Sequence, residues 1–210
     1  MDFALAGVVL LAYLIGSVSF AVLSSRVFGL PDPRSFGSRN PGATNVLRTG
    51  NKYAAIMTLF GDGAKGWVAV YVARLLAIRY NLGDWAVILA AIAVVIGHIY
   101  PVFFRFAGGK GVATILGVLL ALNIWLGLSV IATWLLAAAM WRTSSLSALI
   151  AAGFAPMYAF ALFGVGRYTW LTLILSVILI WRHKENIRNL MARREGAIGK
   201  PPEPGDMPPE

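Results

Sequence analysis

The chain has 210 residues, of which 59% are hydrophobic and only 13% are charged. A soluble domain carries about a quarter charged residues, so this composition excludes a disordered chain, a soluble enzyme domain and a nucleic-acid-binding arm. In so apolar a chain, the net charge of +9 fits basic cytoplasmic loops and anionic ligands or lipids rather than nucleic acid. The absence of cysteine excludes disulfides, thiolate metal sites and cysteine nucleophiles.

Uncharged runs mark the segments that can cross a membrane, because a span needs roughly 20 apolar residues to cross ~30 Å of hydrocarbon. Residues 3–25 lack the basic start and cleavage site of a signal peptide, so they are kept as a span. The run 111–141 has 31 residues and would reach about 47 Å as one helix, so it predicts two helices that turn near residues 123–127. The seven predicted helices lie within 3–25, 53–73, 85–104, 111–141 (two), 143–166 and 168–181.

The basic residues predict the orientation of these helices. With the N-terminus outside, seven crossings place the C-terminus inside, and 15 of the 18 lysines and arginines then lie on or near the cytoplasmic side. That number includes Lys65, near the inner end of its span. A six-helix count would separate Arg142 and the C-terminal segment from the first basic loop. The three basic residues left outside are Arg74, Arg79 and Arg167.

We therefore expect an all-α integral membrane protein with a single transmembrane domain over residues 1–200. The final segment 201–210 reads PPEPGDMPPE, and its Pro-rich, acidic composition predicts a disordered tail. No internal repeat of useful strength is visible.

The first polar segment, residues 32–52, reads DPRSFGSRNPGATNVLRTGNK and is too polar to span. Glycines let backbone N–H groups turn inward, and hydroxyl and amide side chains add neutral donors, so such a loop can form a nest for a phosphate. Arg34, Arg39 and Arg48 add positive charge. The alternative is a flexible basic linker facing lipid headgroups, but the SRNPGATN cluster is richer in amides and hydroxyls than a linker requires.

The second segment, residues 98–114, reads HIYPVFFRFAGGKGVAT. The GGKG turn before an apolar helix is typical of a phosphate site at a helix N-terminus, where backbone donors and the helix dipole favour an anion and Lys110 adds a charge. It is not a Walker A loop, because the GxxxxGK[ST] spacing is absent. The alternative is an ordinary glycine turn with a membrane-anchoring lysine.

The third segment, residues 181–195, reads WRHKENIRNLMARRE and continues the last span into a basic surface helix. His183, Glu185 and Asn186 stand at its start. A histidine at this boundary could bind a phosphate or move a proton near neutral pH. The alternative is an interfacial helix that holds anionic lipid.

Smaller polar features lie within or beside the spans. Asp62 and Lys65 are three residues apart on one helical face, which predicts a structural ion pair beneath the site. His98 is expected to be a core histidine with satisfied hydrogen bonds, and two histidines without clustered carboxylates predict no metal site. The serines that follow Arg142 can cap the next helix or bind an anion from the same side: Ser144, Ser145 and Ser147.

The predicted topology places all three polar segments on one face, beneath an apolar bundle. This arrangement favours one site that holds phosphate groups at the interface and an acyl chain in the membrane. A transporter of a phosphorylated polyol is the alternative, but transporters usually bind near the midplane between repeats. A lipid-binding scaffold would explain the basic C-terminal segment but not two loops rich in Gly and Asn.

These motifs together resemble the bacterial membrane acyl-phosphate:glycerol-3-phosphate acyltransferases. GSRNPGATNVLR is similar to that family's first motif, GHIYPVFFRFAGGKGVAT to its second and RHKENI to its third. The resemblance covers nearly the whole chain, from GSVSF at 16–20 to the region of Glu195. It implies a seven-helix enzyme of the inner membrane. Combined with the orientation that the basic residues predict, this gives a periplasmic N-terminus, a cytoplasmic C-terminus and an active site on the cytoplasmic face.

The resemblance further implies transfer of a fatty acyl group from acyl phosphate to the 1-hydroxyl of glycerol 3-phosphate, with no bound cofactor. Membrane lipid is the other expected partner, nucleic acid is not expected, and the oligomeric state is left open. The catalytic candidates are Lys110, Arg48 and His183, the last as one candidate for the general base. The substrate-binding candidates are Ser38, Asn40, Thr44, Asn45, Gly108, Gly109, Gly111, Ser145 and Asn186.

Four positions depart from the family pattern. Arg39 stands where the family usually has Gly, and Ser19 where Pro is usual. Ala107 replaces the usual Lys before GGKG, with Arg105 two residues away as a possible source of charge. Asn189 stands where a basic residue is common, next to Arg188. These departures concern the fine geometry of the site more than the reaction.

Overall fold

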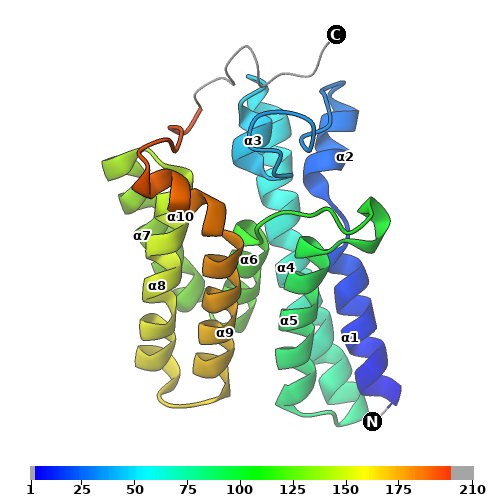
Figure 1. The fold of residues 1–210 in the computed structure, drawn as a ribbon. Coiled ribbons are helices and arrows are strands. Elements are labelled where there is room, and N and C mark those ends of the chain that lie inside the picture. Colours follow the sequence, from blue (N-terminus) through cyan, green and yellow to red (C-terminus); the bar gives the residue numbers. More distant parts are fainter. Residues whose placement is uncertain (1–2, 200–210) are drawn as a thin grey trace.

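The computed structural model describes residues 3–199, and within them all regular secondary structure is helical. The helices run in two opposite directions along a bundle, with α3 and α10 at one end (Figure 1). The expected disordered tail, 201–210, lies outside the described residues. The elements are α1 Phe3–Gly16, α2 Phe20–Val27, α3 Ala43–Leu47, α4 Lys52–Tyr80, α5 Asp84–Ile99, the 3-10 helix η1 Val102–Phe104, α6 Val112–Leu122, α7 Ile124–Trp141, α8 Ser144–Phe163, α9 Arg167–Arg182 and α10 Lys184–Met191.

Four of the described segments are long and apolar enough to cross a membrane, as judged by length and composition. Large apolar side chains also cover the outside of the bundle: Phe3 is 95% exposed and Ile78 is 80% exposed. A surface of this kind suits lipid rather than water. The four segments are Phe3–Val27, Asp84–Phe104, Ile124–Trp141 and Ser144–Phe163.

The remaining three predicted spans are helical but fall short in length or apolar character. α4 has 29 residues but carries Asp62 and Lys65 in its middle. α6 has 11 residues and α9 has 16, which correspond to rises of about 16 and 24 Å against ~30 Å of hydrocarbon. The structure thus agrees with an all-helical membrane protein, while the number of seven spans stays a prediction.

The long uncharged run 111–141 is divided into two helices, as its length predicted. α6 ends at Leu122 and α7 begins at Ile124, and Asn123 between them is extended, with φ of −158°. The Asn123 side chain accepts hydrogen bonds from the backbone N–H groups of Trp125 and Leu126, at 2.8 and 3.3 Å. An asparagine N-cap of this kind satisfies donors that a new helix would otherwise leave unpaired.

Small residues bring α4 and α6 into close contact. A Cβ atom on Gly117 would collide with the carbonyl of Gly63, and one on Gly66 with the carbonyl of Thr114. The two backbones therefore approach more closely than larger residues would permit. This contact fixes the start of α6 against the part of α4 that carries Asp62 and Lys65.

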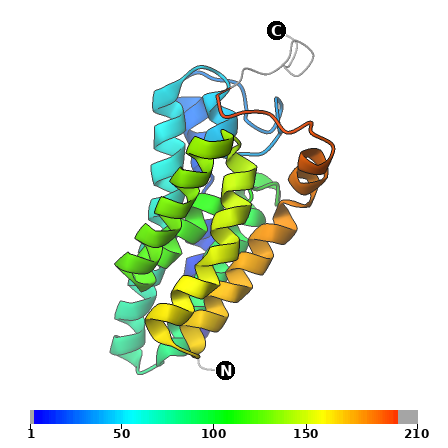
Figure 2. The same ribbon diagram turned by 90° about the vertical axis from the view of Figure 1, so that its left-hand side faces the viewer.

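The polar segments gather at one end of the bundle. Figure 1 and Figure 2 show α3 and α10 at the end opposite to α1's first residues and to the turns that join α4 to α5 and α8 to α9. The segment before α6 crosses the molecule below the level of α3 (Figure 1). Since α6 is short, the GGKG turn lies deeper in the bundle than the first polar loop.

Candidate functional site

The three polar segments meet around one pocket of about 240 Å³. The first loop, the GGKG turn and the junction of α9 with α10 all contribute to its lining. Of the candidates named from sequence, Ser38, Asn40, Gly108 and Lys110 belong to this lining. The full lining is Ser38, Arg39, Asn40, Gly108, Lys110, Trp181, Arg182, Lys184 and Glu185.

Lys110 is half-buried on the GGKG turn, directly before the N-terminus of α6. Gly111 is the N-cap of α6 and has φ of +87°, a conformation that glycine adopts without strain. Burial lowers the pKa of the Lys110 amine; the carboxylates of Glu195 and Glu185 oppose this shift, and Arg182 and Arg48 add to it. The turn thus presents a partly desolvated amine to the pocket.

One of the predicted backbone phosphate donors is already in use. The Gly109 N–H donates to the carbonyl of His98 at 3.2 Å, and the Gly109 carbonyl accepts from Nη2 of Arg182 at 3.3 Å. In this structure the Gly109 N–H is therefore not free to donate to a substrate, while the role of Gly109 in substrate binding stays a prediction. The sequence could not reveal this, because the donor's partner comes from the end of α5.

Asn45 holds the first loop in shape. It is 1% exposed, its Oδ1 accepts from the Ser38 N–H at 3.1 Å, and its Nδ2 donates to the carbonyls of Pro33 and Phe36 at 2.8 and 3.2 Å. Its amide groups are thus committed to the loop backbone. Asn45 positions Ser38, which lines the pocket, while direct contact of Asn45 with substrate stays a prediction.

Arg39 explains one departure from the family pattern. Its φ is +51°, in the left-handed region that favours glycine, and its side chain lines the pocket. A glycine here would adopt the same backbone without strain, whereas the arginine adds a cation. Arg105, considered from sequence as a second source of charge, is exposed and does not belong to the lining.

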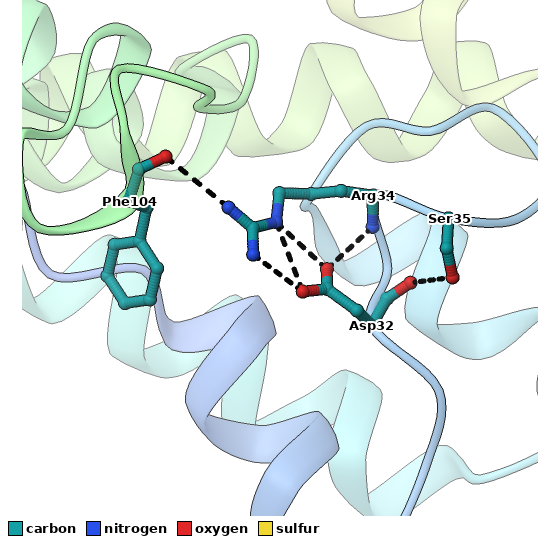
Figure 3. Close-up of polar contacts among 4 residues, drawn as sticks. All are labelled: Asp32, Arg34, Ser35 and Phe104. Carbon is teal, nitrogen blue, oxygen red and sulfur yellow. Dashed lines mark hydrogen bonds and ion pairs between the residues drawn. The ribbon is translucent and has the colours of Figure 1, made fainter.

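Arg34 forms an ion pair within the first loop and also joins this loop to the second polar segment by a hydrogen bond (Figure 3). Arg34 contacts both carboxylate oxygens of Asp32, at distances down to 2.6 Å, and its Nη1 donates to the carbonyl of Phe104 at 3.3 Å. Hydrogen bonding to Arg34 lowers the pKa of the Asp32 carboxyl and raises that of the guanidinium. Ser35 Oγ donates to the Asp32 carbonyl at 2.8 Å and tightens the same turn.

Arg48 and Thr44 connect the first loop to the C-terminal half of the chain. Nη1 of Arg48 lies 3.1 Å from the place that a Cβ atom on Gly37 would take. Nη2 lies 3.4 Å from the corresponding place on Gly196. Thr44 Oγ1 shares a hydrogen bond with Ser144 Oγ at 3.1 Å. Both candidates therefore lie where the first loop meets α8 and the segment after α10.

His183 is the junction residue between α9 and α10. It is 2% exposed, and burial lowers its pKa to about 4. Nδ1 lies 2.8 Å from the carbonyl of Leu179, so the neutral ring carries its proton on Nδ1 and leaves the lone pair on Nε2. Among the described residues, His183 is not part of the pocket lining.

Glu195 is a residue of this region whose role the sequence analysis missed. Its Oε1 accepts hydrogen bonds from Ser145 Oγ and from Asn186 Nδ2, both at 2.6 Å. It thus binds two substrate-binding candidates, from α8 and α10, to the segment after α10. The signal in the sequence was an acidic residue at the end of a strongly basic stretch, MARRE.

The serines at the start of α8 do not cap it, so this expectation is wrong. The N-cap is Thr143, which makes no side-chain capping bond. Ser144 and Ser145 bond to Thr44 and Glu195, and Ser147 Oγ donates back to the Thr143 carbonyl at 2.8 Å. Tertiary partners therefore take the hydroxyls of Ser144 and Ser145, and Ser147 bonds within its own helix end.

Two buried polar atoms beside the pocket lack a hydrogen-bond partner: Nε of Arg182 and Oδ1 of Asn186. Unpaired buried groups are costly, and a ligand that completes their hydrogen bonding is one explanation for them. One is a donor and the other an acceptor, as a ligand with both phosphate and hydroxyl groups requires.

Beneath the pocket, the predicted ion pair between Asp62 and Lys65 is confirmed at 2.8 Å, with both side chains at most 4% exposed. His98 is buried, as expected, but its Nδ1 has no hydrogen-bond partner and lies 3.6 Å from Oδ1 of Asp62. The expectation of a fully satisfied histidine is therefore wrong, because Asp62 is directed primarily toward Lys65.

The sequence matches the family model described as glycerol-3-phosphate acyltransferase over residues 6–193. A glycerol-3-phosphate acyltransferase of Ralstonia nicotianae is 58% identical over 193 residues, covering 92% of this chain and 93% of the relative. One of Thiobacillus denitrificans is 57% identical over 192 residues, covering 91% and 96%.

Solved structures agree with these relatives. The integral membrane glycerol 3-phosphate acyltransferase PlsY (YgiH), in its glycerol 3-phosphate form, superposes with a TM-score of 0.85 at 34% identity, covering 92% of this chain and 95% of that one. Its lysophosphatidic acid form gives a TM-score of 0.84 at 33% identity, covering 93% and 96%.

Proposed function

Because the chain belongs to the glycerol-3-phosphate acyltransferase family, we propose that it takes a fatty acyl group from acyl phosphate and transfers it to the 1-hydroxyl of glycerol 3-phosphate. The products are lysophosphatidic acid and inorganic phosphate, in the first acylation of phospholipid synthesis. The observation that carries this proposal is the convergence of three polar segments on one pocket, above a helical bundle with a lipid-facing surface.

The charge of the pocket suits two phosphate-bearing substrates. Its lining holds four cationic side chains and a single carboxylate, Glu185. A preorganised cluster of cations in a partly desolvated site stabilises developing negative charge more strongly than water does. The four cations are Arg39, Lys110, Arg182 and Lys184.

The chemistry requires no covalent enzyme intermediate, because the phosphate of an acyl phosphate is already a good leaving group. The glycerol hydroxyl oxygen attacks the acyl carbon, the bond from that carbon to the phosphate oxygen breaks, and inorganic phosphate departs. Lys110 and Arg48 stabilise charge on the carbonyl and on the leaving phosphate. Ser38, Asn40 and Asn186 orient the two substrates, and such positioning supplies several kcal/mol of the rate enhancement.

The proton of the attacking hydroxyl has two candidate acceptors, His183 and a substrate phosphate. A histidine with a pKa of about 4 is neutral at pH 7, but it is a weak base for an alcohol. His183 is also buried and is not among the described residues that line the pocket, which further favours the substrate phosphate as the acceptor. In this proposal His183 is a neutral group of the site rather than its essential base.

Product formation tests the reaction directly. Purified protein in detergent is given acyl phosphate and glycerol 3-phosphate, and lysophosphatidic acid and phosphate are measured; acyl-CoA serves as the control donor. The proposal expects stoichiometric products from acyl phosphate alone. Absence of product would reject it, and activity only with acyl-CoA would reject the donor. A transporter of phosphorylated polyols forms no product under these conditions.

We further propose that the protein spans the bacterial inner membrane seven times, with the N-terminus in the periplasm and the pocket at the cytoplasmic face. The lack of cysteine allows a clean test by single-cysteine labelling. Val165 lies between α8 and α9 and is 79% exposed, and Met191 ends α10 and is 82% exposed. An impermeant maleimide should label Val165→Cys in intact cells whose outer membrane is opened, but Met191→Cys only after the inner membrane is disrupted. The reverse pattern would contradict this topology.

A further inference from the structure

Three ionisable side chains lie together in the interior, outside the pocket. Asp62 and Lys65 come from α4 and His98 from the last turn of α5, and they are 3%, 4% and 8% exposed. Besides its contact with Asp62, Nζ of Lys65 donates to the carbonyl of Val18 at 2.6 Å. Val18 lies in the break between α1 and α2, where the carbonyl is not used by a helix. The cluster therefore joins α4 to this break.

His98 lies between this cluster and the GGKG turn. One side of its ring faces Asp62, with Nδ1 at 3.6 Å from Oδ1. On the other side, a Cβ atom on Gly109 would collide with Nε2 of the ring, and one on Gly108 with the His98 carbonyl. The same carbonyl accepts the Gly109 N–H. The ring and backbone of His98 thus form the surface on which the turn rests.

Stability alone gives little reason to bury these charges. Removing two charged groups from water costs several kcal/mol per ion, and apolar replacement of a buried ion pair is often neutral or stabilising. A buried polar arrangement can instead select one conformation among several of similar packing. Here the conformation that would be selected is the one in which the His98 ring packs against the GGKG turn, which carries Lys110.

We propose that His98, which packs against the Asp62–Lys65 pair, is a positioning residue that sets the place of the GGKG turn and thereby directs Lys110 into the pocket. This inference rests on the proposed function, in which Lys110 binds substrate phosphate. None of the three side chains touches the substrate in this scheme. Their effect reaches the reaction only through Gly109 and Lys110.

The first test removes both charges of the pair in an Asp62→Leu/Lys65→Met double variant. We expect the melting temperature in detergent to stay within ~3 °C while kcat for acyl transfer falls at least ~10-fold, because apolar replacement preserves packing but releases the histidine. Wild-type turnover in the folded double variant would overturn the inference. If the wild-type protein itself forms no lysophosphatidic acid, the proposed function fails instead, so the two failures are distinguishable.

A matched control uses a buried polar contact on the same helix. Ser24 and Thr58 share a hydrogen bond of 2.6 Å between α2 and α4, and both are fully buried. A Ser24→Ala/Thr58→Val double variant also removes a buried polar pair, whose α4 member lies one turn before Asp62. It should keep kcat within ~2-fold of the wild type, since apolar replacement of both partners is nearly neutral.

A second test does not depend on the folding of the charge-free variant. Gly109→Ala introduces the methyl group that would collide with the ring, and His98→Ala removes that ring. We expect each single variant to lose activity at least ~10-fold, and the double variant to be at least ~10-fold more active than the product of the two losses predicts, since the clash is gone. Multiplicative losses within ~2-fold would show that the ring does not support the turn.

Discussion

Two ion pairs of the molecule, Asp62–Lys65 and Asp84–Arg167, have nearly the same length, 2.8 and 2.9 Å, but lie in opposite surroundings. The first is at most 4% exposed and lies beneath the pocket, whereas the side chains of the second are 51% and 57% exposed at the far end of the bundle. An exposed pair is screened by water and contributes little, while loss of one partner of a buried pair leaves an uncompensated charge in the interior.

The same contrast holds for the two ends of the bundle. At the pocket end, Asn45, Glu195 and Arg34 each bind two or more partners, mostly from other parts of their loop or from other segments. At the far end, the helices are joined by short turns such as the one around Asn81. Polar residues at the pocket end thus define loop conformations, whereas those at the far end mainly terminate helices.

The largest expected effect is on catalysis at the pocket end. Lys110→Ala removes a half-buried cation from the lining, and we expect kcat/KM to fall by about 10²–10³-fold, as for loss of one preorganised group that stabilises transition-state charge. Turnover of purified protein, with the melting temperature as the folding control, measures this. Wild-type activity in a folded Lys110→Ala variant would refute the phosphate-site assignment.

The next effect is a dependence of the free energy of unfolding on pH, which comes from a buried histidine at the pocket end. The pKa of His183 lies at about 4, below its ordinary 6.5, so the unfolded chain binds this proton more strongly than the folded chain. Stability is therefore complete above pH 6.5 and falls by up to about 3 kcal/mol as the pH drops toward 4. Melting curves between pH 4.5 and 7.5 should show this loss, and His183→Gln should reduce it.

The activity of the same variant tests whether His183 or a substrate phosphate accepts the proton. If a substrate phosphate accepts the proton, His183→Gln keeps turnover at pH 7 within a few-fold of the wild type. A loss of several orders of magnitude in a folded variant would restore His183 as the essential base.

A smaller effect concerns the brace of the first loop. Asn45→Ala leaves the Ser38 N–H and two backbone carbonyls without their present partner, and we expect a loss of about 2 kcal/mol in the free energy of unfolding. KM for glycerol 3-phosphate should rise because Ser38 is displaced. Denaturant unfolding in detergent and steady-state kinetics check the two effects, and an unchanged stability would contradict the bracing role.

Arg39 offers a change of opposite sign. Arg39→Gly relieves a left-handed backbone conformation, and we expect about 1 kcal/mol of added stability together with a rise in KM for the phosphate-bearing substrates. The melting temperature measures the change in stability, and steady-state kinetics measure the change in KM. A variant that is both less stable and fully active would contradict the strain and the binding role together.

The smallest effect belongs to the far end. Asp84→Asn breaks the exposed pair with Arg167, and the free energy of unfolding should change by less than about 0.5 kcal/mol, with activity unchanged. The measurement is the melting temperature at low salt. A large loss would show that exposure is not what distinguishes the two ion pairs.

Several features could be predicted from the sequence because they depend on local or compositional physics. The uncharged run 111–141 is longer than one helix needs to cross the membrane, so a break within it was predicted. The break lies at Asn123, which is the N-cap of α7. The three-residue spacing of Asp62 and Lys65 sufficed for their ion pair. The motifs, taken together, were specific enough to identify the family, since catalysis constrains residue types more tightly than packing does.

Other features could not be predicted, because their partners are distant in the sequence. Glu195 binds Ser145 across 50 positions, and the Gly109 N–H turns to His98 rather than toward the pocket. The serines of α8 resembled caps, but tertiary hydroxyl and carboxylate partners took their hydrogen bonds. Local patterns cannot rank such partners, because the choice depends on which groups the packed helices bring together.

The sequence by itself therefore determined the class, the family and the three polar segments that meet at the pocket, because hydrophobicity, charge and motif identity are properties of the chain alone. Only the tertiary structure decided which polar groups face the pocket and which brace the loops around it. The physical reason lies in burial, since a donor withdrawn from water must bond to whatever the fold places beside it. The few charged residues thus take different roles in the folded chain: some line the pocket, Asp62 and Lys65 pair in the interior, and Asp84 and Arg167 pair at the far end of the bundle.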